Sequence, residues 1–256
     1  MNGSCAPVAI IPARVQSSRF PGKVLARLHG KPMIQWVWES ACRAERIERV
    51  LVATGDPEVA QAVQKFGGEV AWTPVELPSG TDRVAYVAKD LKAEIIVNLQ
   101  ADEPLLPPQS LDRLVAALQN SPEWDMATLG VRLSDERLLQ DFDTVKVVVS
   151  RNHEALYFSR APLAASVDRE FHKHIGIYGF RRSALLRFCD WPPGNLEKAE
   201  RLEQLRALEN GMRIRVILQP EDTIAVDRPE DLRRVEQYLA GQFSTEKIDA
   251  IPKGSS

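Results

Sequence analysis

Short apolar runs alternate with longer amphipathic stretches in the first half of the chain. The runs cover residues 8–11, 50–53, 69–72 and 95–99. Each run is followed by a loop and by apolar positions that recur at helical spacing. Strands that alternate with helices in this way form a parallel sheet with helices on its faces. The pattern therefore predicts an α/β fold.

A long loop separates the first predicted strand from the first predicted helix. We expect that helix to start at Lys31 and Pro32, because proline is favoured in a first helical turn. Residues 12–30 lie between the two elements, and a loop of this length is uncommon in a compact α/β unit and is usually functional. It follows the carboxyl end of a strand, where open α/β sheets bind ligands, so chemistry is expected here first.

The second half of the chain has a different pattern, which favours mixed or antiparallel additions to the sheet. Apolar runs predict further strands at residues 127–131, 144–150, 175–180, 213–219 and 223–226. A helix is expected from about 196 to 210, and a last helix from 229 to 239 that ends at Gly241. Residues 1–242 are interpreted as a single domain, and residues 243–256, which have no periodicity, as a mobile tail.

The 256-residue chain has the composition of an ordinary globular protein, with 44% apolar and 27% charged residues. Its 33 Lys and Arg nearly balance 35 Asp and Glu, so the net charge of −2 predicts no nucleic-acid partner. No apolar run reaches the length of a membrane span and the first residues do not resemble a secretory signal. We therefore expect a cytoplasmic protein without stable membrane insertion. Three widely spaced cysteines favour reduced thiols over disulfides or a zinc site.

The loop over residues 12–30 carries three cations among small and hydroxyl residues. Arg14, Arg19 and Lys23 closely follow the first predicted strand. Together with backbone N–H groups, three cations can surround a triphosphate and stabilise charge during phosphoryl transfer. A solvated loop of ordinary positive charge is the alternative. Neither a G-x-G-x-x-G motif nor a P-loop is present, which disfavours a dehydrogenase or a P-loop kinase.

Two aspartates are candidate metal ligands. Asp102 follows the apolar run 95–99, which places its carboxylate at the same sheet edge as the cationic loop. Mg²⁺ is held by one or two carboxylates with phosphate oxygens and water, so Asp102 is a suitable ligand, although this segment also fits a common turn. Asp227 is the second candidate. Glu230 follows it by three residues, so the pair equally fits the cap of the last helix.

A third polar segment precedes a helix expected around residues 84–91. The backbone N–H groups of Ser79 and Gly80 can meet a nucleotide at this helix N-terminus. Ser79 with Asp82 also fits a capping pattern, which would be purely structural.

The predicted helix over residues 196–210 is amphipathic. Its apolar positions predict a core-facing stripe of Ala199, Leu202, Leu205 and Leu208. The opposite side carries Glu197, Glu200, Glu203 and Gln204. Taken alone, this side is typical of a solvated charged surface.

Nine segments in order resemble the 3-deoxy-D-manno-octulosonate (Kdo) cytidylyltransferases, from residue 8 to about residue 239. They are IPARVQSSRFPGK (11–23), GKPMI (30–34), SGTDR (79–83), NLQADEP (98–104), VKVV (145–148), YFSRAP (157–162), HIGIYGF (174–180), LEKAERLEQLR (196–206) and VDRPEDL (226–232). Each segment alone is a weak signal, whereas nine in family order are a specific one.

The resemblance implies a nucleotide-diphospho-sugar transferase-like α/β fold. In that fold a mixed, mostly parallel sheet is flanked by helices, and a smaller subdomain serves dimerisation and sugar binding. The implied reaction converts CTP and Kdo to CMP-Kdo and pyrophosphate, a step of lipopolysaccharide biosynthesis. The anomeric hydroxyl of Kdo attacks the α-phosphorus in line, Mg²⁺ is the cofactor, and the protein is a homodimer.

The resemblance also assigns roles to residues, and these replace the interpretation of the helix 196–210 as a solvated surface. Metal binding is expected at Asp102 and Asp227. The catalytic residues would be Lys23, Arg19, Asp102 and Asp227. The nucleotide would contact Arg14, Ser18, Arg19, Lys23, Ser79, Gly80, Arg83 and Gln100. The sugar would contact Gln100, Arg160, His174, Tyr178, Glu203 and Gln204.

Other activities stay open on the sequence. The chain departs from the family at Ala101, where glycine is usual, and between Ala161 and His174, where it is shorter. An 8-amino-8-deoxy Kdo analogue or an acylneuraminate is therefore an alternative sugar. A glycosyltransferase that consumes a nucleotide sugar would be expected to carry Asp-x-Asp after a strand, whereas this chain has Ala-Asp-Glu. A non-catalytic nucleotide-binding module would bind CTP without releasing pyrophosphate.

Overall fold

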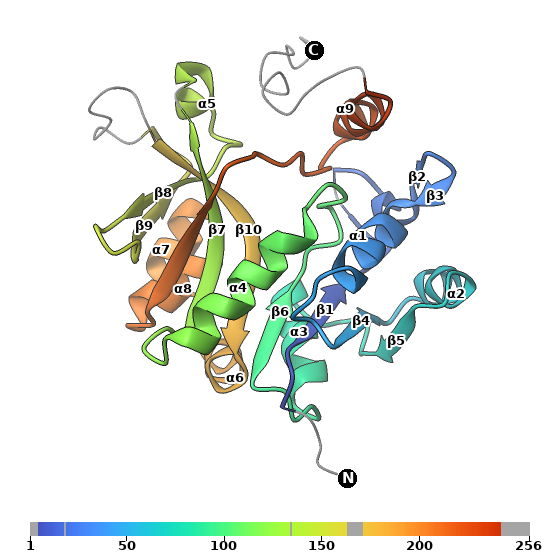
Figure 1. Ribbon diagram of the computed structural model, residues 1–256, viewed down its shortest axis with the longest axis horizontal. Helices are drawn as coiled ribbons and strands as arrows, with labels where there is room; N and C mark the ends of the chain where they lie inside the picture. Colours follow the sequence, from blue (N-terminus) through green and yellow to red (C-terminus); the bar gives the residue numbers. More distant parts are fainter. Residues whose placement is uncertain (1–4, 18, 134, 163–170, 242–256) are drawn as a thin grey trace.

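The computed structural model describes residues 5–17, 19–133, 135–162 and 171–241 (Figure 1). Two predictions lie outside these residues: the triphosphate contact of Ser18 and the tail over residues 243–256.

Within the described residues, a nine-stranded sheet has the order β11-β7-β10-β6-β1-β4-β5, with β8 paired to β10 and β9 paired to β8. Its strands are β1 (Val8–Pro12), β4 (Arg49–Thr54), β5 (Glu69–Trp72), β6 (Ile95–Asn98), β7 (Met126–Leu133), β8 (Lys146–Val149), β9 (Ala155–Ser159), β10 (Phe171–Arg181) and β11 (Ile214–Gln219). The half formed by β6, β1, β4 and β5 is parallel, whereas β10 runs antiparallel to β6, β7 and β8. The predicted mixed α/β sheet is confirmed.

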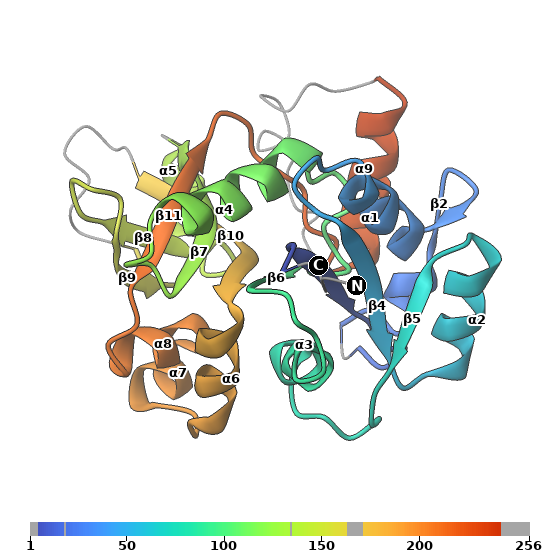
Figure 2. The same ribbon diagram turned by 60° about the horizontal axis from the view of Figure 1, so that its bottom comes forward.

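Helices cover both faces of this sheet (Figures 1 and 2). They are the 3₁₀ helix η1 (Lys23–Leu25), α1 (Met33–Cys42), α2 (Pro57–Lys65), α3 (Gly80–Ala88), α4 (Pro108–Asn120), α5 (Glu136–Gln140), α6 (Arg182–Asp190), α7 (Asn195–Glu200), α8 (Gln204–Glu209) and α9 (Pro229–Leu239). Side chains of β1 alternate between the faces. Ala9 and Ile11 pack with α1, α2 and α4, whereas Val8 and Ile10 pack with α3 and α6.

The chain returns to the parallel half through its last described segment. A small hairpin of β2 (Arg27–Leu28) and β3 (Lys31–Pro32) packs, with α9, in a third apolar cluster that includes Leu28, Val226 and Val235. The helix predicted from Lys31 starts two residues later, because Lys31 and Pro32 form β3. The cluster holds residue 226 beside the loop that follows β6, where Val226 N–H donates to the carbonyl of Asp102.

Two predicted elements are wrong. Residues 223–226 are not a strand, and Val226 N–H instead donates to the carbonyl of Asp102 at 2.8 Å. The single helix predicted over residues 196–210 is two helices, α7 and α8, because Arg201 adopts a left-handed conformation with φ of 55°. The break also leaves Ala199 exposed instead of in the core.

Candidate active site

Two hydrogen bonds donated by backbone N–H groups hold the described part of the loop after β1. Val15 N–H donates to the Asp56 carboxylate at 2.7 Å, and Gly22 N–H donates to the Val15 carbonyl at 2.9 Å. Gly22 has a φ of 71°, a conformation that glycine adopts at little cost. This turn starts η1 at Lys23 and directs the lysine side chain back over the end of β6.

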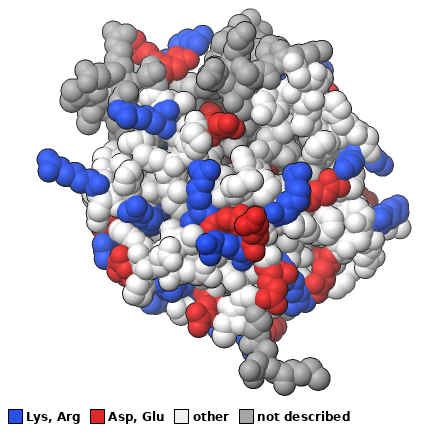
Figure 3. All heavy atoms as spheres, viewed as in Figure 1, with Lys and Arg blue, Asp and Glu red and all other residues white. Residues whose placement is uncertain are grey.

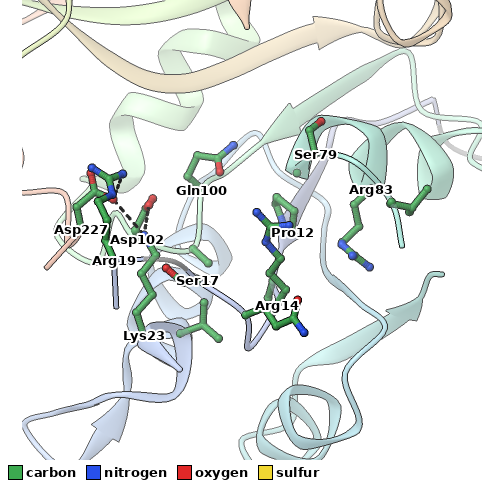
Figure 4. A pocket seen from close by; sticks show the side chains of 16 residues that line it. Pro12, Arg14, Ser17, Arg19, Lys23, Ser79, Arg83, Gln100, Asp102 and Asp227 are labelled. Atoms are coloured by element: carbon green, nitrogen blue, oxygen red, sulfur yellow. Dashed lines mark hydrogen bonds and ion pairs between the residues drawn. The ribbon is translucent and has the colours of Figure 1, made fainter. Parts of the chain in front are cut away.

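A pocket of about 270 Å³ opens at the carboxyl ends of β1 and β6 (Figure 4). Its wall contains most residues that were assigned to the nucleotide and the metal, although Arg14 and Asp227 lie in distant parts of the sequence. The members among the predicted residues are Arg14, Arg19, Lys23, Ser79, Gly80, Arg83, Gln100, Asp102 and Asp227. Gln16, Ser17 and Leu77 also line the pocket and were not predicted.

The ammonium of Lys23 lies between the two candidate metal ligands. Its Nζ donates to Asp102 Oδ2 at 2.7 Å and to Asp227 Oδ1 at 3.3 Å, and also to the Val226 carbonyl at 3.2 Å. Burial of Lys23 opposes its charge, but the two carboxylates outweigh this effect and the pKa of Lys23 is raised. The site therefore keeps a charged ammonium at the pocket floor.

Asp227 is not the cap of the last helix. The carboxylate of Asp231 accepts the N–H groups of Asp227 and Arg228 at 3.0 and 2.9 Å, so the capping box of α9 joins Arg228 at the N-cap to Asp231. The Asp227 carboxylate instead contacts Arg19 Nη2 at 2.9 Å and Lys23. The capping alternative is wrong for this residue, and its side chain is available to the pocket.

The carboxylates of Asp102 and Asp227 have the donor chemistry of a magnesium site. They are hard oxygen ligands, they converge on one cation in this structure, and they leave room for phosphate oxygens in the open pocket. Among the described residues there is no group of three or more His, Cys, Asp and Glu side chains that could hold a metal alone. Mg²⁺ is commonly held by one or two protein carboxylates together with phosphate oxygens of the substrate. The residues present therefore fit Mg²⁺.

Ser79 and Arg83 shape the wall of the pocket at α3. The predicted capping box is confirmed, because the Ser79 hydroxyl accepts Asp82 N–H at 3.0 Å and the Asp82 carboxylate accepts Ser79 N–H at 3.1 Å. The buried guanidinium of Arg83 donates to the Thr73 hydroxyl and to the carbonyls of residues 74 and 75. Arg83 thus fixes the turn after β5.

Ala101, expected above as a departure from the family pattern, lines the same pocket. It is 5% exposed and is not among the described non-glycine residues with positive φ. The alanine therefore fits this turn without a left-handed conformation.

The residues assigned to the sugar form a second group, on β10 and around α7 and α8. His174 is buried, its Nε2 lies 2.9 Å from the Thr128 hydroxyl, and its ring contacts Phe158 and Tyr178. Burial lowers the pKa of His174 to about 3, so the ring is neutral at physiological pH. Burial, with the charge of Glu203, raises the pKa of Tyr178.

Arg160 is held by the end of α7. Its backbone N–H donates to the Glu200 carboxylate at 2.9 Å, and its guanidinium Nε donates to the Glu200 carbonyl at 3.2 Å. Below it, the fully buried Lys146 donates to the carbonyl of Arg160 at 2.6 Å and to those of Asp141 and Thr144. Glu200 was predicted on a solvated face, and its contacts show that this part of the chain is structural.

Glu203 connects the two groups. Its carboxylate accepts the hydroxyls of Ser79 and Thr81 at 3.0 and 2.6 Å, and it lines a second cavity of about 590 Å³ beside α6 and α7. The larger cavity also carries cations and carboxylates, but it does not contain the cluster of Lys23, Asp102 and Asp227 that lines the smaller one. Gln204 is 4% exposed and belongs to the interior. The structure does not place Arg160, His174, Tyr178 or Gln204 in the wall of the first pocket.

Sequence reasoning missed Asp56 and Glu103. Asp56 carries no motif, and its role in holding Val15 depends on the pairing of β1 with β4. Glu103 is buried beside Asp102, and burial raises its pKa to about 8. The two adjacent acidic residues in the sequence were the only signal for Glu103. That signal does not show that Asp102 faces the pocket and Glu103 the interior.

Charges of both signs are intermixed on the face seen in Figure 3. No helix in the described part of the chain is long and apolar enough to cross a membrane.

The comparisons with known proteins agree with this geometry. The profile of the cytidylyltransferase family matches residues 8–214. A 3-deoxy-manno-octulosonate cytidylyltransferase from Geobacter sulfurreducens is 48% identical over 90% of this chain and 98% of its own length. An 8-amino-3,8-dideoxy-manno-octulosonate cytidylyltransferase from Shewanella halifaxensis is 45% identical over 90% of this chain and 97% of its own.

Solved structures support the same relationship. A CMP:2-keto-3-deoxy-manno-octonic acid synthetase in complex with CTP superposes with a TM-score of 0.88, at 40% identity, over 93% of this chain and all of that one. A 4-diphosphocytidyl-2C-methyl-D-erythritol synthase from Anaerococcus prevotii shares the fold, with a TM-score of 0.63 at 13% identity, over 92% of this chain and 98% of that one. The chain therefore belongs to the 3-deoxy-manno-octulosonate cytidylyltransferase family.

Proposed function

We propose that this protein transfers CMP from CTP to the anomeric hydroxyl of 3-deoxy-D-manno-octulosonate. A bond forms between the anomeric oxygen and the α-phosphorus, and the bond from that phosphorus to pyrophosphate breaks. The observation that carries the proposal is the pocket at the end of the sheet in which Arg19 and Lys23 contact two carboxylates, with Arg14 in the same wall. Cations and carboxylates at one sheet edge are the groups that nucleotidyl transfer requires.

The chain's own cations perform the electrostatic part of this reaction. Lys23 and Arg19 now contact Asp102 and Asp227, and on nucleotide binding they turn to the phosphates. Charge builds on the leaving pyrophosphate, so cations fixed beside it stabilise the transition state more than the bound substrate. Arg14, exposed at the same pocket, completes the cationic wall.

Asp102 and Asp227 are the residues that would hold Mg²⁺. When bound, the metal would neutralise negative charge on the phosphates of CTP. The family relationship and the oxygen donors support this assignment, and removal of divalent metal by a chelator is its direct test.

The sugar is assigned from the family and from the second group of residues. Arg160 offers a cation for the carboxylate of an acidic sugar, and Glu203 offers acceptors for its hydroxyls. A second candidate substrate is the 8-amino-8-deoxy analogue, because the Shewanella relative, which carries that name, is 45% identical to this chain.

Pyrophosphate release tests the proposal. The purified protein is incubated with CTP and Mg²⁺ and with each of three sugars: Kdo, its 8-amino-8-deoxy analogue and an acylneuraminate. We expect release with Kdo at a rate well above that with the acylneuraminate. Faster turnover of the amino analogue would transfer the assignment to that sugar. CTP binding without release for any sugar would identify a nucleotide-binding module.

A further inference from the structure

A line of polar side chains connects the active-site pocket to the second cavity. Gln100 Nε2 donates to Asn98 Oδ1 at 3.1 Å, and Asn98 Nδ2 donates to Thr81 Oγ1 at 3.0 Å. The Thr81 hydroxyl donates to Glu203 Oε2 at 2.6 Å. Asn98 and Thr81 are 0% and 3% exposed, whereas Gln100 and Glu203 line the two cavities. The line therefore runs through the wall between them.

The carboxylate of Glu203 fixes the direction of every hydrogen bond in this line. Burial raises the pKa of the Glu203 carboxyl, whereas the hydroxyls of Thr81 and Ser79 and the charge of Arg206, 3.9 Å away, oppose this effect and favour the ionised form. An ionised carboxylate only accepts. Thr81 gives its one hydroxyl hydrogen to Glu203, so its oxygen must accept from the amide nitrogen of Asn98. The side-chain carbonyl oxygen of Asn98 then faces Gln100 and accepts a hydrogen bond from the amide nitrogen of Gln100.

The carbonyl oxygen of Gln100 is thereby left for the pocket. Gln100 Oε1 lies 3.8 Å from the position that a Cβ on Gly80 would occupy, at the pocket wall. Figure 4 shows Gln100 between Asp102 and Ser79 in this wall. An oxygen held there accepts a hydrogen bond from a hydroxyl and repels another acceptor.

We propose that Thr81 and Asn98 are positioning residues that fix the amide of Gln100, so that its carbonyl oxygen receives a hydroxyl of the acidic sugar. The inference rests on the proposed function for the identity of that ligand. Neither residue lines the pocket, so both act through Gln100 and Glu203. Without the Thr81 hydroxyl, the orientation of the Asn98 amide is no longer fixed. The Gln100 amide can then rotate and exchange the positions of its oxygen and nitrogen.

Thr81→Val and Thr81→Ser test this role, because valine keeps the shape and serine keeps the hydroxyl. We expect Thr81→Val to raise KM for Kdo about fivefold or more, with KM for CTP within about twofold of wild type. Thr81→Ser should restore KM for Kdo to within about twofold. Ser110→Ala, which removes a buried hydroxyl that donates to Gln219 at 2.8 Å, controls for general loss of packing and should leave both KM values unchanged. Equal changes in both KM values, or no rescue by serine, would overturn the proposal.

A double-mutant cycle identifies the residue through which Thr81 acts. On a Gln100→Ala background, Thr81→Val should change KM for Kdo by less than about twofold, because the positioned group is gone. A full additional effect there would contradict the role in positioning Gln100. Asn98→Leu provides a second variant if Thr81→Val does not fold, since it removes the oxygen that accepts from Gln100, and the same rise specific to Kdo is expected.

Side-chain amide exchange measured by NMR tests the hydrogen-bond line without any turnover. The Asn98 amide hydrogens should exchange with solvent about tenfold faster in Thr81→Val than in wild type or Thr81→Ser. Unchanged exchange would overturn the positioning role. If wild type releases no pyrophosphate with any sugar, the proposed function fails, and the exchange measurement still decides whether Thr81 and Asn98 fix Gln100.

Discussion

Lys23 is a cation whose partners come from distant parts of the sequence. It is anchored by Asp102, which follows β6, and by Asp227, which precedes α9. Its raised pKa keeps it charged while no anion is bound. A triphosphate that enters the pocket competes with these carboxylates for the ammonium. The charged side chain of Lys23 is thus already in place to stabilise the departing pyrophosphate.

Lys23→Ala should lower kcat by about a hundredfold or more, with KM for CTP within a fewfold of wild type. The reason is that charge on the departing pyrophosphate is greatest in the transition state. Steady-state kinetics with varied CTP measures both constants. Lys31→Ala, which removes an exposed lysine paired with Glu39, is the control and should leave them unchanged. A rise in KM with unchanged kcat would make Lys23 a simple binding contact.

His174 should make the protein less stable in acid. Its pKa is about 3 in the fold and about 6.5 in an unfolded chain, so the unfolded state binds more protons between these values. The contribution is complete above pH 6.5 and is lost as the pH falls toward 3. In His174→Gln, the slope of the unfolding free energy with pH should therefore fall by up to about 1.4 kcal/mol per pH unit in this window. Denaturant titrations at pH 4–8 measure it, and identical slopes for both proteins would contradict a buried neutral histidine.

At the scale of elements, periodicity predicted most strands correctly, but it wrongly predicted a strand at residues 223–226 and missed the break in the helix over residues 196–210. The runs at residues 8–11 and 69–72 became β1 and β5, because alternation and burial are local signals. The helix over residues 196–210 failed, since no apolar period reveals the left-handed conformation of Arg201. The cap predicted at Asp227 was wrong for a related reason, because only the backbone path decides that the capping box joins Arg228 to Asp231 and not Asp227 to Glu230.

Asp227→Asn and Asp231→Ala should separate the metal ligand from the helix cap. Asp227→Asn is expected to unfold within about 0.5 kcal/mol of wild type, because the cap is intact, yet to lose most activity and require more Mg²⁺. Asp231→Ala should lose about 1 kcal/mol of stability. Thermal melts and Mg²⁺ titrations of turnover give both results. Near-normal activity and Mg²⁺ dependence in Asp227→Asn would remove it from the proposed metal site.

At the scale of the whole molecule, the site depends on how the sheet is assembled. Antiparallel β10 lies between β6 and β7, which places the sugar-side group beside the parallel half that carries the nucleotide pocket. Motif order in the sequence identified both groups through the family resemblance. Their separation, and the link that Glu203 makes between them, require the tertiary structure, because hydrogen bonds between residues 79 and 203 leave no local pattern.

The homodimer implied by the resemblance gives a prediction for the exposed residues of β9. Leu156 on β9 is 57% exposed, and burial of such a side chain is a favourable part of an interface. Light scattering should give about twice the chain mass of 28.6 kDa for wild type. Leu156→Glu should shift the mass toward one chain, whereas Trp72→Glu, which changes an equally exposed residue on β5, should not. A wild-type mass of one chain at working concentration would contradict the dimer.

The most direct test of the account is the stoichiometry of products from CTP, Kdo and Mg²⁺. Pyrophosphate and sugar nucleotide should form in equal amounts with the wild-type protein, and both should stop when excess chelator is added. Asp102→Asn should lower both rates by about a hundredfold or more while leaving thermal stability close to wild type. Undiminished turnover in chelator, or a fully active Asp102→Asn variant, would contradict a metal-assisted cytidylyl transfer in this pocket.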